Sequence, residues 1–222
     1  MATDWTTVSS LATAGGTLVL AVATFASVRS ANRAARVAEQ ALMENLRPLL
    51  VPSRLDDTRQ KIFFQEGRHM LLEGGYGGAE FENGVVYLGL SLRNAGQGIA
   101  VLHGWRFRGG AELNPQRPAL ESFRHQGRDI LIAPNDVGFW QGAFRDSSDP
   151  QYDEAVSVVK SDDDEVSITI DLLYGDNDGG QRVISRMMLR AFNRRGDAGA
   201  DNRRVWLASV VRHWNIDRPD PR

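Results

Sequence analysis

The sequence predicts a mainly β protein, an immunoglobulin-like antiparallel β-sandwich preceded by one long N-terminal transmembrane and juxtamembrane α-helix. Three observations support this fold class. Residues 5–28 contain no charged side chain, and residues 29–46 continue a helical pattern without Gly or Pro. Beyond Pro48 the apolar residues recur with a period of two, which is typical of strands that bury one face.

Residues 1–28 are expected to form an N-terminal segment and a transmembrane helix. At 1.5 Å per residue the uncharged run gives a helix about 36 Å long, and a bilayer core is about 30 Å thick. Arg29, Arg33 and Arg36 follow directly. Since basic residues accumulate on cytoplasmic flanks, the sequence predicts a single-pass cell-membrane protein with its N-terminus outside and its β domain in the cytoplasm.

Two alternatives to this topology are open. A cleaved signal peptide is one, because Ala21-Val22-Ala23 has the small-x-small form of a cleavage site. Signal peptides begin with positive charge, however, and the only charged side chain before this apolar run is Asp4. The other is an inverted topology with the β domain outside the cytoplasm in an adhesion or envelope role, which the arginine flank opposes.

Residues 29–47 are predicted to continue as a juxtamembrane helix that ends at Arg47-Pro48, since the residue before proline avoids helical angles. We expect its apolar stripe to pack against the globular domain. Weak self-association is the alternative, because Ala12 and Gly16 form a small-xxx-small pair within the predicted span. The stripe has three- and four-residue spacing and consists of Ala31, Ala35, Ala38, Leu42 and Leu46.

Residues 48–216 are predicted to form the β-sandwich, followed by a flexible tail at 217–222. Because no βαβ spacing separates the apolar segments, we expect antiparallel pairing. The predicted strands are 49–52, 62–64, 85–92, 100–107, 129–132, 138–144, 166–174, 182–192 and 205–214.

A family resemblance adds to this fold prediction. The Arg47-Pro48 pair after the helix and the segment Leu92-Arg93-Asn94-Ala95-Gly96-Gln97-Gly98-Ile99-Ala100 resemble a group of uncharacterised single-span bacterial proteins. Those proteins carry a juxtamembrane helix and a small immunoglobulin-like β-sandwich with an N-x-G-x-G-x-A strand connection. The resemblance covers roughly the first two thirds of the chain. It implies the fold class and no activity.

Composition excludes several function classes. A formal net charge of −2 argues against nucleic acid as the main partner, because nucleic-acid-binding domains are usually basic. The chain has no cysteine and four scattered histidines, which disfavours a disulfide framework and a transition-metal site. A Gly-x-Ser-x-Gly nucleophile elbow is also missing.

Two glycine-rich stretches are interpreted as structural. Asn94 to Gly98 lacks the third glycine of a dinucleotide-binding loop and precedes a strand, so its glycines are expected to allow positive φ between two strands. The stretch Gly74–Gly78 lacks the Lys-Ser/Thr ending of a phosphate-binding loop. We expect it to form a flexible hairpin tip.

Two acidic runs raise the question of calcium. Asp162–Glu165 is expected to be a solvated loop, and Asp176–Gly180 a hairpin turn. A calcium loop with Asp176 and Asp178 as ligands would place Tyr174 at its first position, so the spacing fails.

We therefore expect no catalytic, cofactor-binding or metal-ligating residue and no cofactor. The predicted function is a membrane-anchored binding or scaffolding module that contacts lipid through residues 5–28 and recruits a protein partner at the inner membrane face. The alternative is a loop-built ligand-binding or hydrolytic site that uses Asp171, Asp176 and Asp178. Four tryptophans fall in predicted strands and are expected in the core, with Trp140 the candidate for exposure; they are Trp105, Trp140, Trp206 and Trp214.

Overall fold

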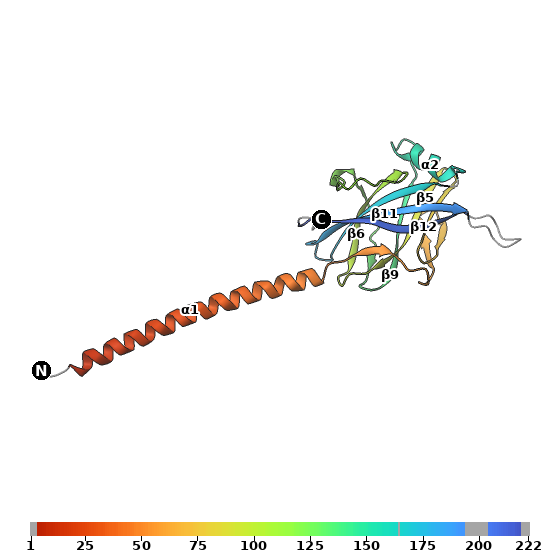
Figure 1. Ribbon diagram of the computed structural model, residues 1–222. Helices are drawn as coiled ribbons and strands as arrows, with labels where there is room; N and C mark the ends of the chain where they lie inside the picture. The colour runs from red at the N-terminus through yellow and green to blue at the C-terminus, as the bar shows by residue number, and fades with distance from the viewer. Residues whose placement is uncertain (1–3, 164, 194–203, 219–222) are drawn as a thin grey trace. The chain divides into compact units, whose positions relative to one another are not determined.

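A computed structural model describes residues 4–163, 165–193 and 204–218. The chain forms two compact units, Met1–Asn45 and Leu46–Arg222, which are described one at a time (Figure 1).

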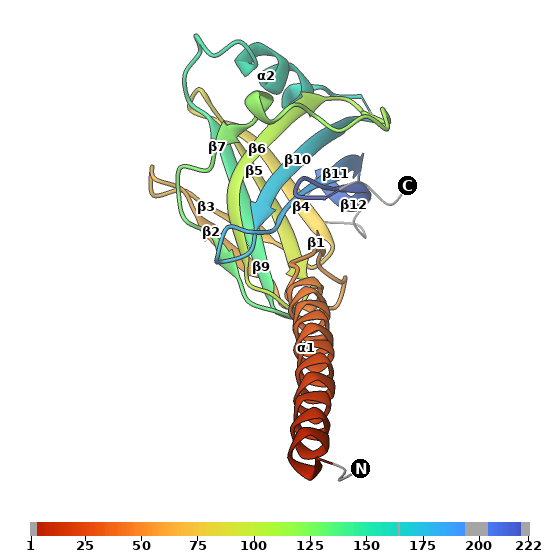
Figure 2. The same cartoon turned by 90° about the vertical axis from the view of Figure 1, so that its left-hand side faces the viewer.

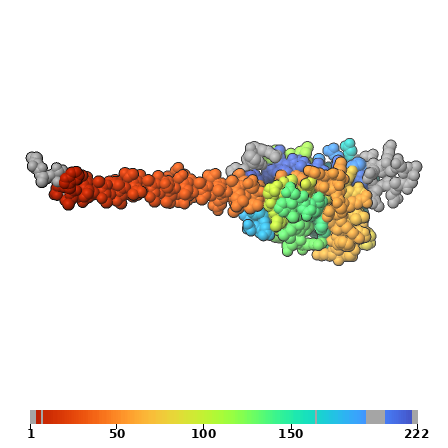
Figure 3. Space-filling model, turned by 90° about the horizontal axis from the view of Figure 1, so that it is seen from below, coloured from red at the N-terminus to blue at the C-terminus, as the bar shows by residue number. Residues whose placement is uncertain are grey.

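The first unit is a single helix, α1 (Trp5–Asn45), of 41 residues. Each of its described side chains is exposed, and its Val8–Asn45 portion is long and apolar enough to cross a membrane. Figure 3 shows these side chains uncovered along the helix. The predicted span and the predicted juxtamembrane helix are therefore one continuous element, which ends shortly before Arg47.

Hydroxyl side chains interrupt the apolar part of α1, and the helix itself satisfies them. Thr13 Oγ1 donates to the carbonyl of Ser9 at 2.9 Å. Thr17 Oγ1 and Thr24 Oγ1 donate in the same way to carbonyls four residues earlier, each at 2.8 Å. These three hydroxyls need no water, which is the condition for placing them in hydrocarbon.

The second unit consists of strands and two short helices. Every strand pairing in its described residues is antiparallel, so the predicted mainly β, antiparallel class is confirmed. The elements are β1 (Leu50–Pro52), β2 (Gln60–Phe63), β3 (His69–Leu72), β4 (Tyr76–Glu82), β5 (Val85–Asn94), β6 (Ala100–Gly109), the 3-10 helix η1 (Leu120–Ser122), β7 (Arg124–His125), β8 (Leu131–Ile132), β9 (Val137–Phe144), α2 (Tyr152–Lys160), β10 (Ser167–Gly175), β11 (Arg182–Asn193) and β12 (Arg204–Asn215).

Ten of these strands form one sheet, and β2 pairs only with β3 in a second, two-stranded sheet. The main order is β1-β5-β4-β12-β11-β10-β6-β7, with β9 added to β5 and β8 added to β6. The β2–β3 hairpin lies against β9, β4 and β5 (Figure 2). The immunoglobulin-like class is a finer assignment than this strand order establishes, and it stays a prediction.

The main sheet curls so that strands far apart in its order meet around one core. Trp105 of β6 lies edge-on to Trp140 of β9, with ring centres 5.3 Å apart. Phe107 of β6 and Phe144 of β9 are 5.2 Å apart. Gln126 closes the same region by accepting a hydrogen bond from Trp140 Nε1 at 3.1 Å. Edge-to-face aromatic packing therefore joins the two ends of the sheet.

The prediction of a flexible hairpin tip at Gly74–Gly78 is wrong. Gly75 does make a turn, with φ of +77°, but Gly77 and Gly78 lie within β4. A Cβ on Gly77 would lie 2.5 Å from a methyl of Leu189, and a Cβ on Gly78 would overlap Met70 Sδ. Glycine is required here because the core and the β2–β3 hairpin approach this strand closely.

Candidate functional site

The three carboxylates of the hydrolytic alternative have separate surroundings. Asp171 is buried in the middle of β10. Asp176 is half-buried in the β10–β11 turn, where its Oδ1 accepts a hydrogen bond from Gln181 N at 3.1 Å. Asp178 is exposed in the same turn. Each side chain has its own local role, so the arrangement does not support a shared catalytic site.

Asp171 belongs to a buried ion pair on the face of the sheet opposite the core. Arg186 of β11 is fully buried and donates from Nε to Asp171 Oδ1 at 2.7 Å and from Nη2 to Oδ2 at 3.1 Å. Arg106 of β6 donates from Nη1 to Asp171 Oδ2 at 2.6 Å. The carboxylate is thus held by guanidinium groups from both strands that flank β10.

The segment between β6 and η1 covers this pair. The Glu112 carboxylate lies 3.4 Å from Arg186 Nη2, and Arg186 Nη1 donates to the carbonyl of Asn114 at 2.8 Å. The guanidinium of Arg186 also stacks 4.9 Å from the ring centre of Trp214, whose Nε1 donates to the carbonyl of Pro115 at 3.2 Å. Arg186 therefore joins β10, β12 and the covering segment.

The charged side chains of this cluster stabilise the fold by pairing with one another. Burial alone would lower the pKa of Arg106, but hydrogen bonds to Asp171 and Glu112 raise it above the usual arginine value. Both oxygens of Asp171 accept hydrogen bonds from guanidinium groups. The cluster therefore holds β6, β10 and β11 together through paired charges.

A second buried network crosses β10, β11 and β12. Ser185 Oγ lies 2.8 Å from the Tyr174 hydroxyl and 2.6 Å from His213 Nδ1, and the Tyr174 hydroxyl accepts a hydrogen bond from Leu50 N at 3.0 Å. Ser185 is fully buried, so a substrate has no access to this Ser–His contact. Burial raises the pKa of Tyr174 to about 12. The network is a structural one.

The Asn94–Gly98 connection fastens the first strand of the domain. Asn94 is fully buried, and its Oδ1 accepts hydrogen bonds from Leu49 N at 3.1 Å and Gly96 N at 3.0 Å. Its Nδ2 donates to the carbonyl of Gly98 at 2.6 Å and to that of Ile132 at 3.1 Å. One side chain thus ties β1, β5 and β8 together, and the loop is a strand connection as predicted.

The prediction that the glycines of the Asn94–Gly98 connection are needed for positive φ is wrong. Gly96 and Gly98 are not among the described residues with positive φ. Instead, a Cβ on Gly96 would overlap the carbonyl of Arg47, and a Cβ on Gly98 would overlap that of Leu46. Glycine is required because two backbone segments approach within contact distance.

The N-terminal start of this unit is also held by a charged contact. Arg47 Nη1 donates to Asp217 Oδ1 at 3.0 Å and to Asn215 Oδ1 at 3.2 Å. The hydrogen bond from Arg47 lowers the pKa of the Asp217 carboxyl. Asp217, which opens the predicted tail, is therefore bound to the domain.

The predicted exposure of Trp140 is wrong, because the curled sheet buries it completely. Arg124 lies over the neighbouring rings, 5.5 Å from the centre of Trp105 and 4.7 Å from that of Phe144. Its Nη2 donates to Asp149 Oδ1 at 2.6 Å, and this contact with Arg124 lowers the pKa of Asp149. The other three tryptophans of the domain are buried, as expected: Trp105, Trp206 and Trp214.

Within the described residues, no group of three or more His, Asp or Glu side chains is spaced to hold a metal ion. His103 and His213 are half-buried, and burial lowers the pKa of His103. Asp164, part of the first acidic run, lies outside the described residues. In that run Asp163 Oδ2 accepts a hydrogen bond from Ser161 Oγ at 2.9 Å.

The outward face of the β2–β3 hairpin is an accessible apolar surface that the sequence reasoning missed. Phe63 is 52% exposed and Leu71 is 59% exposed. Lys61 pairs with Leu71 and His69 pairs with Phe63 across the hairpin, so the four side chains share this face. Strict alternation could have revealed it, because the inward face buries Ile62, Phe64, Met70 and Leu72.

Comparisons with protein-family models, with curated proteins and with solved structures found no match to this chain.

Proposed function

We propose that this chain is a single-pass membrane protein whose β domain is a non-catalytic binding or scaffolding module. The observation that carries the proposal is the uncovered apolar part of α1. Five large side chains there are 63–69% exposed, and each would contribute about 1.5–3 kcal/mol on transfer to an apolar environment. Lipid supplies that environment through residues 5–28. The five are Leu18, Val19, Leu20, Val22 and Phe25.

The arginine flank supports an orientation with the N-terminus outside and the β domain in the cytoplasm. Arg29, Arg33 and Arg36 follow the apolar run, whereas Asp4 precedes it. Basic residues are retained on the cytoplasmic side during insertion. In this orientation the anchor concentrates the domain at the inner leaflet, which favours encounters with proteins confined to the same surface.

The outward face of the β2–β3 hairpin is the proposed contact surface for a protein partner. Phe63 and Leu71 are large, apolar and exposed, and Lys61 and His69 beside them add polar contacts. Interfaces commonly combine such apolar anchors with a polar rim. A neutral charge balance, with a formal net charge of −2, supports a protein rather than a nucleic acid as partner.

Three finer assignments belong to the proposal. Antiparallel pairing, together with a second sheet of β2 and β3 packed against β4, β5 and β9, supports an immunoglobulin-like sandwich. The backbone clamp at Asn94 supports kinship with the single-span bacterial proteins that share this strand connection. Exposure of Ala12 and Gly16 on α1 supports weak homo-oligomerisation through the helix.

Reporter enzymes fused after Arg222 test the topology. A reporter that works only in the cytoplasm should be active, and one that works only outside should be silent. The opposite pattern would overturn the inner-face proposal and favour an adhesion or envelope role.

A further inference from the structure

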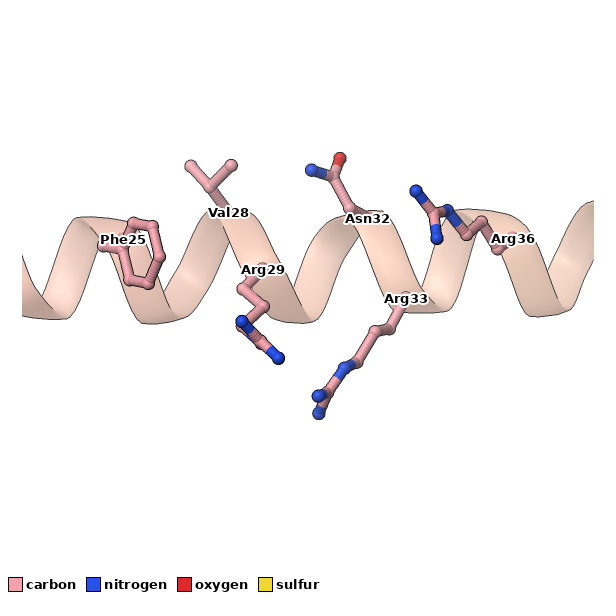
Figure 4. Close-up of a pocket in the computed structure, with 6 residues that line it drawn as sticks. All are labelled: Phe25, Val28, Arg29, Asn32, Arg33 and Arg36. Atoms are coloured by element: carbon pink, nitrogen blue, oxygen red, sulfur yellow. The ribbon is translucent and has the colours of Figure 1, made fainter.

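Arg29, Arg33 and Arg36 lie on one face of α1 directly after its apolar part. Their spacings of four and three residues place them within about 60° of each other around a helix that turns about 100° per residue. Together with Phe25, Val28 and Asn32 they line a shallow hollow in the helix surface. In Figure 4 the side chains of Arg29 and Arg33 project from one edge of the helix, and that of Arg36 lies toward the other edge, near Asn32.

The three guanidinium groups are available for a ligand. In the part of the chain that the structure describes, none of them forms a hydrogen bond or an ion pair with another residue. This separates them from Arg106 and Arg186, whose donors are engaged by carboxylates. All three side chains are exposed.

The depth of these residues matches the lipid phosphates if residues 5–28 span the bilayer. The headgroup layer on each side of the core is roughly 5–8 Å thick. The distance along the axis from Arg29 to Arg36 is about 10 Å, and long arginine side chains adjust their position by several ångströms. Glu39, the next charged residue, lies about 15 Å beyond Arg29 and therefore outside this layer.

We infer that the Arg29–Arg33–Arg36 face binds the headgroup phosphate of an anionic phospholipid, an inference that rests on the membrane anchoring proposed above. A planar guanidinium binds two phosphate oxygens at once. The Asn32 amide at the same hollow can donate to a headgroup hydroxyl, and Phe25 and Val28 contact the upper acyl chain. Charge complementarity selects an anionic lipid over a zwitterionic one.

The experiment uses the full chain in nanodiscs of phosphatidylcholine that contain a small fraction of photoactivatable phosphatidylglycerol or, in parallel, photoactivatable phosphatidylcholine. Both leaflets have the same composition, so the orientation of the protein does not affect the result. We expect phosphatidylglycerol to label α1 at least about five-fold more than phosphatidylcholine, the factor expected for a single basic residue near an anionic surface. Arg29→Gln with Arg33→Gln and Arg36→Gln should reduce this ratio to about one.

A charge-matched variant separates a site from general attraction. Arg33→Ala with Ala31→Arg keeps the net charge and keeps all three arginines between positions 29 and 36, but moves one of them to the opposite side of the helix, about 3 Å along the axis. The inference requires this variant to lose most of the preference. Labelling equal to that of the unchanged chain would overturn it in favour of diffuse charge attraction. Excess inorganic phosphate should leave labelling unchanged, and full competition by it would overturn a lipid headgroup as the ligand.

Flotation with phosphatidylcholine vesicles distinguishes a failure of membrane anchoring from a failure of the lipid site alone. A chain that does not float with the vesicles overturns the membrane anchoring and the lipid site together. A chain that floats but shows equal labelling by the two lipids overturns the lipid site alone.

Discussion

The buried hydroxyl of Tyr174 links the stability of the domain to alkaline pH. Its folded-state pKa is about 12, against about 10 for an unperturbed tyrosine. The neutral form is therefore favoured in the folded state. Its contribution is fully present below pH 10 and is lost as the pH rises through 12, which amounts to about 2–3 kcal/mol.

Tyr174→Phe should show this dependence directly. At pH 7 the variant loses the hydrogen bonds to Leu50 N and Ser185 Oγ, so we expect its free energy of unfolding to fall by about 1–3 kcal/mol. Toward pH 12 the difference from the unchanged chain should shrink. Urea unfolding of the full chain in detergent, followed by tryptophan fluorescence, measures both. A difference that stays constant with pH would contradict the proposed linkage.

Tyr174 stabilises the domain as a neutral group, whereas Asp171 contributes to stability through a buried, paired charge. Asp171→Leu leaves Arg186 buried with only the more distant Glu112 carboxylate beside it, and we expect a loss of about 3–5 kcal/mol in the free energy of unfolding. Adding Arg186→Met should recover part of this loss, since the uncompensated charge is removed and Arg106 keeps Glu112. Urea unfolding of the two single variants and the double variant measures the coupling. Additive losses would contradict a direct pair.

The Asp171–Arg186 pair could have been predicted from the sequence, whereas the contacts of the segment between β6 and η1 could not. The turn at Asp176–Gly180 fixes the register that places Asp171 opposite Arg186, so pairing could have been deduced from the hairpin alone. Glu112 and Asn114 reach the same cluster from a segment without periodicity. Only the three-dimensional course of the chain brings them there.

Among the structural elements, the connection between β5 and β6 shows why two glycines are needed. A Cβ on Gly98 would overlap the carbonyl of Leu46, whereas a Cβ on Gly127 meets nothing within 4 Å. We expect Gly98→Ala to lower the free energy of unfolding by about 3 kcal/mol, since backbone must move. Gly127→Ala, the matched control, should change it by less than about 0.5 kcal/mol. Equal stability of both variants in urea would contradict the close-approach argument.

Two adjacent residues of the β2–β3 hairpin test which of its faces is buried and which is exposed. Phe64 is 4% exposed and packs edge-on against Tyr87 at 4.7 Å, whereas Phe63 is 52% exposed. Phe64→Ala should cost about 3–5 kcal/mol, and Phe63→Ala less than about 0.5 kcal/mol. Thermal unfolding of the full chain compares them. Similar losses would mean that Phe63 is covered and unavailable as a contact surface.

Elements with strong apolar alternation could be predicted from the sequence. Elements whose residues are set by packing against other parts of the fold could not. The alternating segment at 166–174 corresponds closely to β10. The strand β4 was not predicted because Gly77 and Gly78 carry no side chain that would show a period of two. Glycine is required at these positions because Leu189 lies against Gly77 and Met70 against Gly78. The helix α2 escaped because its three valines resemble a strand; they are Val156, Val158 and Val159.

At the scale of the whole molecule, the strand order could not be deduced from the chain. Pairings between sequence neighbours, such as β10 with β11, follow from hairpin turns. The contact of β4 with β12 joins segments separated by most of the domain and depends on how the sheet curls. The long apolar helix was easier to predict, because its signal is the order of charged and apolar residues along one continuous segment.

That order of residues gives a prediction for the whole protein. Asp4→Lys with Thr6→Lys, combined with glutamine at the three flanking arginine positions, leaves the formal net charge unchanged but moves positive charge to the N-terminal side of the span. If the flank sets topology, reporters fused after Arg222 should exchange activity, with the outside reporter becoming active.

Glu39→Gln with Glu44→Gln is the matched control, because it makes the C-terminal flank more positive in net charge without adding a basic residue. Acidic residues contribute little to topology, so this variant should keep the original reporter pattern. An unchanged pattern in the charge-moved variant would mean that folding of the β domain before insertion, and not the arginine flank, holds it on its side of the membrane. The orientation would then be a property of the domain, and the arginines would be left with the lipid contact alone.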